Sequence, residues 1–289
     1  SLRISSHSFP YRRLFPIILA NTAAYAIVKT NHLNAEKTGL AHADGKPGYI
    51  LWGTVNAKGY IMTGISKEIE YHKTNFLNHP LFNYLNDDAL SLDERLRFLP
   101  YISHFVMSFA DINKYILPFA TPANALERAV NTHAREDAEH WPWFLNDLQT
   151  SGQNSAASLT EHLSFLWADN LINSRKLTYH LIQALHNQSA KMRLIVIEVM
   201  EATGNATFDT LASITKGTDK QLEYCGHLHL SHETGHSMGS EDEIVDTLNL
   251  TEEERNKASQ MIAECFNAFH RFFDEIFENV SPEHSRSIK

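Results

Sequence analysis

The chain is poor in cysteine, and this limits the classes of fold open to it. Cys225 and Cys265 are its only two cysteines in 289 residues, and neither belongs to a Cys-x-x-Cys pair. Two cysteines cannot build the disulfide framework of a small secreted domain, so the reducing cytoplasm is the default location. The length suits one large domain or two small ones.

Positive charge and long apolar runs are also scarce. Lys and Arg number 25 against 34 Asp and Glu, which gives a formal net charge of −9. Because nucleic-acid-binding domains carry a basic patch, we expect no nucleic acid partner. The apolar stretch 15–28 contains Pro16 and Asn21, so we expect no membrane partner. It follows Arg12-Arg13, and a weak signal sequence is the alternative interpretation.

Glycine and proline are sparse, with 12 and 9 in the chain, and apolar residues recur at helical spacing from about residue 64. This pattern predicts an all-α fold, with a helical domain at 62–289 and a poorly defined N-terminal extension at 1–61. Short strands are possible at 48–53 and 59–62. The predicted helices cover 65–86, 91–117, 122–148, 156–186, 188–203, 205–215, 218–236 and 251–280.

Two segments carry the same polar pattern, with four side chains at offsets of zero, three, four and seven residues. On an α-helix these offsets form one stripe, with neighbouring Cβ atoms about 5–6 Å apart. Each stripe therefore gathers imidazoles and carboxylates on one helical face. The first consists of His133, Glu136, Asp137 and His140, and the second of His229, His232, Glu233 and His236.

The stripes occupy positions where apolar residues are expected. Val130 and Phe144 flank the first stripe at core spacing, so we predict that the polar groups face the interior. Buried ionisable groups cost several kcal/mol each unless they are paired or bound to a cation. Mixed His and carboxylate sets suit iron, manganese or zinc. The alternative is a solvated face or a hydrogen-bonded His–carboxylate network.

A third element adds two carboxylates. Glu198 and Glu201 interrupt the apolar run 194–202 and share one helical face. We favour Glu201 as a metal ligand and Glu198 as a partner that orients a ligand, although the reverse assignment stays open. His232 has the same orienting role in the second stripe. Pro142 leaves two alternatives, a kinked helix or the start of a new one.

The order of these motifs resembles a family. His229-x3-Glu233-x2-His236 resembles the third-helix ligand motif of the haem-oxygenase-like diiron oxidases, where the middle acid is usually Asp. Glu201-Ala-Thr resembles their mid-chain helical Glu. The run beginning His79-Pro-Leu-Phe resembles an early helix of the related TenA and PqqC-like proteins. The resemblance covers roughly residues 65–280.

The first stripe resembles the family's first ligand pair in two alternative ways, as Asp137-x2-His140 or as Glu136-x3-His140. It departs from the family at His133, where many relatives have a Glu. The resemblance implies a haem-oxygenase-like bundle of about seven helices. It also implies two iron ions, with manganese or zinc as alternatives, that activate O₂ on a small carboxylic or amino acid-like substrate. A homodimer is left open.

Three other interpretations remain. A ferritin-like diiron protein would use Asp137-x2-His140 and Glu233-x2-His236 as its paired helical motifs. A metal-free TenA-like hydrolase would use Cys225 as its nucleophile. The third alternative is a metal-binding protein without enzymatic activity.

Overall fold

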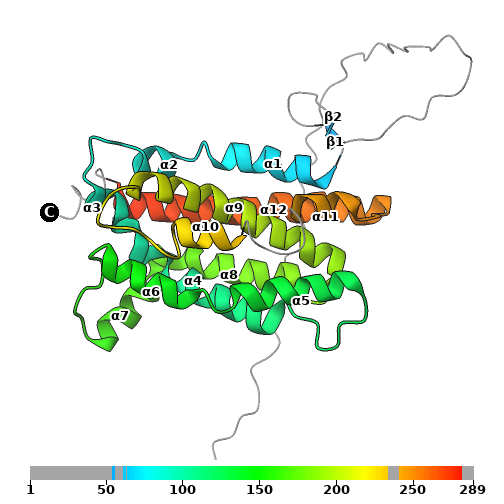
Figure 1. The fold of residues 1–289 in the computed structure, drawn as a ribbon, viewed down its shortest axis with the longest axis horizontal. Coiled ribbons are helices and arrows are strands. Elements are labelled where there is room, and N and C mark those ends of the chain that lie inside the picture. Colours follow the sequence, from blue (N-terminus) through cyan, green and yellow to red (C-terminus); the bar gives the residue numbers. More distant parts are fainter. Residues whose placement is uncertain (1–53, 56–60, 63, 234–240, 282–289) are drawn as a thin grey trace, which may run out of the picture. The chain divides into compact units, whose positions relative to one another are not determined.

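Two long helices, the largely buried α9 and the amphipathic α12, build the core of the protein. The computed structural model describes residues 54–55, 61–62, 64–233 and 241–281. Helix α12 (Glu252–Val280) begins at a capping box in which Thr251 and Glu254 bond reciprocally to backbone N–H groups. It packs against α8 (Ile172–Leu185) and α9 (Ala190–Thr215), and α1 (Ile65–Phe76) covers α9 and α12 (Figure 1).

The other elements surround this core, and the prediction of an all-α multi-helix bundle is confirmed. Helices α5 (Ala125–Asp137) and α10 (His227–Glu233) both pack on α9, so segments far apart in sequence meet there. The remaining elements are α2 (Pro80–Leu85), α3 (Leu92–Arg95), the 3₁₀ helix η1 (Leu96–Ile102), α4 (Ser103–Asp111), the π-helix η2 (Ile112–Ile116), α6 (Trp141–Thr150), α7 (Leu159–Leu166), the 3₁₀ helix η3 (Asp169–Leu171) and α11 (Glu241–Thr247).

Several predicted helix boundaries were wrong. The break predicted at Gly204 does not exist, because α9 continues through it. A Cβ atom at this position would lie 3.2 Å from the ring of Phe208, so glycine here makes room for an aromatic side chain. The predicted helix 65–86 is divided before Pro80, where the ring of His79 caps α2 by accepting from Leu81 N.

Two further corrections concern the second half of the chain. The helix predicted at 218–236 begins only at His227, after an irregular segment. Helix α11 occupies residues for which no helix was predicted. Both differences follow from tertiary contacts that helical periodicity does not report.

The described part of the N-terminal region is a pair of antiparallel strands. β1 (Thr54–Val55) pairs with β2 (Ile61–Met62), with Thr54 opposite Met62. β2 overlaps the strand predicted at 59–62, whereas the strand predicted at 48–53 lies outside the described residues. Most of the predicted 1–61 extension lies outside them as well. No helix among the described residues is long and apolar enough to cross a bilayer.

Candidate metal centre

Helix α5 presents His133 and Asp137 to the interior, one turn apart. Both side chains are buried, and His133 Nε2 lies 3.2 Å from Asp137 Oδ2. The second carboxylate oxygen, Asp137 Oδ1, lies 3.6 Å from His140 Nδ1. The two oxygens of Asp137 therefore face two different histidines.

His140 lies in a break between two helices. α5 ends at Asp137, and α6 begins at Trp141 with Pro142 in its first turn, where a missing N–H costs nothing. A kinked helix and the start of a new helix were the two alternatives at Pro142, and in the structure a new helix starts there. The ring of Trp143 stacks on that of His140, with centroids 4.3 Å apart and planes at 14°. The break and this stacking together fix where the imidazole points.

Helix α10 contributes His229, which is buried. Its Nε2 lies 3.2 Å from His140 Nδ1, and its Nδ1 lies 2.9 Å from the carbonyl oxygen of Tyr224. A carbonyl oxygen only accepts hydrogen bonds, so we assign the proton to Nδ1. In the neutral ring, Nε2 then carries the lone pair that a metal ligand requires. This lone pair lies on the side of the ring that faces His140.

A buried carboxylate holds the segment before α10. Asp147 on α6 is fully buried and accepts hydrogen bonds from Glu223 N (2.6 Å) and Cys225 N (2.8 Å). Burial raises the pKa of Asp147 to about 6, against the opposing effect of these backbone donors. The segment it holds carries the Tyr224 carbonyl that orients His229.

Helix α9 contributes the third face of the cluster. Glu201 Oε1 lies 3.1 Å from His133 Nδ1, so this imidazole has carboxylates at both ring nitrogens. Glu198, one turn earlier on α9, is buried. We call the five residues of this arrangement the donor cluster: His133, Asp137, His140, Glu201 and His229.

Part of the donor cluster fits a metal ion. Asp137, His140 and His229 each offer one ligand atom, and these atoms lie within 4.8 Å of one another. Metal–ligand bonds of about 2.0–2.2 Å place adjacent ligand atoms roughly 3 Å apart, close to the separations seen here. Within the described part of the chain, the buried Asp137 Oδ1 accepts no hydrogen bond, which leaves its lone pairs for a cation.

The charge state of Asp137 agrees with this role. Burial alone would raise its pKa, but the neighbouring imidazoles of His133, His229 and His140 outweigh that effect and hold the pKa below its ordinary value. The carboxylate is therefore ionised near neutral pH and is ready to bind a cation.

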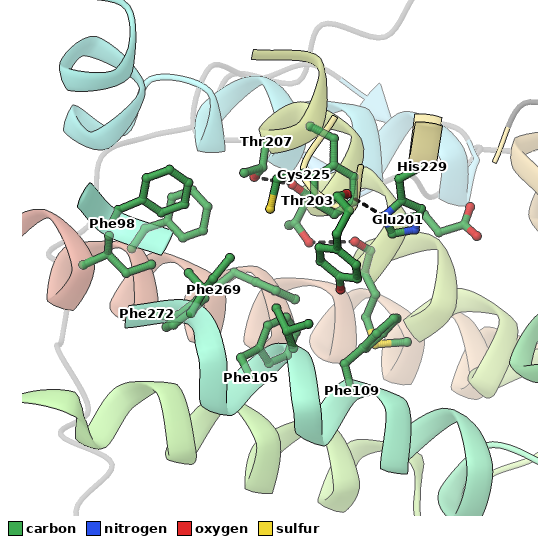
Figure 2. A pocket seen from close by; sticks show the side chains of 18 of the residues that line it. Phe98, Phe105, Phe109, Glu201, Thr203, Thr207, Cys225, His229, Phe269 and Phe272 are labelled. Atoms are coloured by element: carbon green, nitrogen blue, oxygen red, sulfur yellow. Dashed lines mark hydrogen bonds between the residues drawn. The ribbon is translucent and has the colours of Figure 1, made fainter. Parts of the chain in front are cut away.

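An elongated cavity opens from the donor cluster (Figure 2). Its volume is about 80 Å³. Seven phenylalanines contribute to its wall, so most of it is apolar. The lining residues are Leu81, Leu85, Phe98, Ile102, Phe105, Val106, Phe109, His133, Asp137, Met200, Glu201, Thr203, Gly204, Thr207, Phe208, Tyr224, Cys225, His229, Phe269, Phe272, Phe273 and Ile276.

Some of the predicted site residues belong to the donor cluster, and others do not. The donor cluster unites residues from both stripes and from α9. Helical phase accounts for His133 and Asp137, whereas His140 lies beyond the end of α5 and not on the single helical stripe that was predicted. Glu136 is half-buried on α5, beside Asp137. His232 is exposed, and its ring centroid lies 5.1 Å from that of Trp143. Glu233 ends α10, but its side chain and His236 lie outside the described residues.

Sequence reasoning missed three residues that shape the site. Asp147 left one signal, a carboxylate between Phe144 and Leu148 on an otherwise apolar helical face. Phe208 stacks on His229 with ring centroids 4.6 Å apart. Tyr224 acts through its backbone carbonyl, which no sequence pattern reports.

In comparisons with known proteins, no family model and no curated protein matches the chain.

Proposed function

We propose that the chain is a non-haem iron protein that activates O₂ for the oxidation of a small carboxylic or amino acid-like substrate. The observation that carries this proposal is the convergence of Asp137, His140 and His229 in a buried position beside a cavity. A structural metal site is closed on all sides, whereas a catalytic site keeps a position open to a substrate.

Each neighbouring residue has a definable task in this proposal. The negative charge of Asp137 offsets part of the charge of a bound cation. Tyr224 O fixes the tautomer of His229, and Trp143 limits rotation of His140. The phenylalanines of the cavity exclude bulk water and so strengthen electrostatic interactions at the site.

The donor cluster supports a proposal of two bound metal ions. Asp137, His140 and His229 would hold the first, and His133 with Glu201 would begin the second, to which the sequence adds Glu198, Glu233 and His236 as candidates. Asp137 faces both groups through its two oxygens. Bound ferrous iron would supply electrons for the reduction of O₂ and leave coordination positions for a substrate.

The hydrolase alternative is weaker. The Cys225 thiol lines the cavity, but burial and the neighbouring Asp147 raise its pKa well above the usual range. A nucleophilic cysteine needs a lowered pKa and a positive neighbourhood. Cys225 is better described as a small apolar wall residue. Both cysteines are free thiols, which supports the proposal of a reducing, cytoplasmic location.

The test is anaerobic reconstitution with ferrous iron, followed by metal analysis and by measurement of O₂ consumption with candidate carboxylic acids. We expect iron to bind to the wild type and to be lost in His140→Ala. His232→Ala is the matched control, because this imidazole is close to the site but exposed. Equal iron loss in both variants would argue against the ligand assignment.

A further inference from the structure

The apolar cavity beside the donor cluster is small. Its volume of about 80 Å³ is several times the space that one water molecule needs, but only about half of the roughly 150 Å³ of an apolar protein cavity that holds one benzene molecule. An organic molecule with a long carbon chain does not fit in this space. A gas molecule of two atoms does.

The polar groups of the cavity are confined to one end of it. Figure 2 places Glu201 and His229 at one end and Phe98 at the opposite end, with Phe105 and Phe269 between them. The part of the cavity that lies away from the donor cluster is therefore lined mainly by aromatic and aliphatic side chains.

The remaining polar atoms of the wall are too few to hold water. Thr203 Oγ1 donates to Val199 O (3.1 Å) and Met200 O (2.9 Å), and Thr207 Oγ1 donates to Thr203 O (2.8 Å), so both hydroxyls are bonded to their own helix. Tyr224, which also lines the cavity, adds one phenolic hydroxyl. A buried water needs about two to four polar partners. One hydroxyl does not supply them, so we expect the apolar part of the cavity to be dry.

The thiol in the wall is held in its less reactive form. Burial and the neighbouring Asp147 raise the pKa of Cys225 well above the usual range, so the thiol stays protonated. Oxidation of cysteine follows thiolate character and exposure, and Cys225 has neither. A wall of this composition can hold an oxidant without reacting with it.

The chain offers a larger and more polar space elsewhere. A hollow of about 310 Å³ is lined by residues of α1 and α9, among them Lys67, Lys73, Glu198 and Asn205. Among the described residues, none lines both this hollow and the apolar cavity. An organic molecule therefore has space to bind outside the apolar cavity.

We propose that the apolar part of the cavity is a binding site for a small apolar gas. Resting on the proposed function, this gas is O₂, which the cavity holds beside the donor cluster, while the organic substrate reaches the metal from outside the cavity. An apolar solute gains free energy when it leaves water for an apolar environment. The dry wall therefore concentrates the gas without making a polar contact to it.

The gas site is tested without metal. Dissolved O₂ is paramagnetic and speeds the relaxation of nearby protons, so methyl-labelled, full-length protein is compared by NMR under O₂ and under N₂. The relaxation rates of Leu81, Ile102 and Ile276, which line the cavity, should increase several-fold more than those of Leu177 and Ile262, which are buried but do not line it. Equal increases in the two sets, or magnetisation transfer from water to the cavity methyls, would overturn the inference.

Two valines supply a matched pair of variants. Val106 lines the cavity, whereas Val196 does not, and both are buried. Val106→Phe should weaken the binding of xenon, measured from xenon-induced methyl shifts, by about tenfold or more, because the added ring fills the space that the gas occupies. Val196→Phe should leave xenon binding unchanged. If the phenylalanine variants do not fold, Val106→Ile and Val196→Ile give the same comparison with a smaller change. Equal xenon affinity in the two variants contradicts the cavity assignment.

The ferrous protein separates this inference from the proposed function. If the gases enter the cavity but the protein retains no iron, the proposed function fails while the gas site stands. If iron is retained and consumes O₂ but neither gas enters the cavity, the gas site fails while the proposed function stands. Where both hold, xenon at a pressure that fills the cavity should slow the reaction of the ferrous protein with O₂. An unchanged rate overturns the assignment of the gas as O₂.

Discussion

Asp147 gives the sharpest prediction about stability, because two opposing effects act on one buried carboxylate. Burial destabilises its charged form, whereas the N–H groups of Glu223 and Cys225 stabilise that form. The balance raises its pKa from 3.8 to about 6. The folded protein therefore binds a proton in this interval that the unfolded chain has released.

The raised pKa of Asp147 determines how the free energy of unfolding changes with pH. The stability contributed by Asp147 is full below about pH 4 and is lost as the pH rises through 6. A shift of about two units corresponds to roughly 3 kcal/mol. Asp147→Asn removes the titration and keeps the side chain's shape. Relative to the wild type, the variant should therefore gain about 2–3 kcal/mol between about pH 4.5 and pH 7.5.

The assay is urea unfolding of metal-free protein, followed by circular dichroism at several pH values across this range. Asp209→Asn is the control, because Asp209 is an exposed carboxylate on α9. If Asp147→Asn instead loses stability relative to the wild type as the pH rises, the backbone hydrogen bonds outweigh burial and our account of this segment is wrong.

Three further predictions concern the site and its surroundings. His140→Ala should reduce iron occupancy at least tenfold, whereas His232→Ala should retain most of the iron. The reason is that the His140 imidazole is buried among the donors and the His232 imidazole is exposed. Metal analysis of the two variants, matched for folding by circular dichroism, measures the difference. A chain that begins at Met62 should bind iron with unchanged stoichiometry, and loss of metal from a folded truncation would contradict the prediction. Cys225 and Cys265 should resist alkylation at pH 8 until the protein is unfolded. Burial raises the pKa of the Cys225 thiol well above the usual range and that of the Cys265 thiol to about 12. Rapid labelling of either thiol in the native protein, measured by mass spectrometry, would refute this prediction.

The helical phase of the polar stripes predicted much of the candidate site. A buried position for His133 and Asp137 followed from their place between apolar residues, and Glu201 followed from a carboxylate within an apolar run. These inferences rest on local spacing, which the sequence records directly.

What the sequence did not reveal depends on contacts between distant segments. The late start of α10 follows the anchoring of residues 223–225 by Asp147, which lies more than seventy positions earlier. Gly204 looked like a helix break because glycine disfavours helices, but Thr203 and Ala206 beside it are buried and Phe208 packs against it. The aromatic cavity likewise gathers side chains from helices that only tertiary packing brings together.

The most direct test of the central claim is the iron content of protein purified without oxygen and reconstituted with ferrous iron. The donor cluster predicts two ions per chain in the wild type and about one in His133→Ala, which removes the imidazole between Asp137 and Glu201. A folded wild-type protein that retains no iron, manganese or zinc after removal of excess metal would contradict the account.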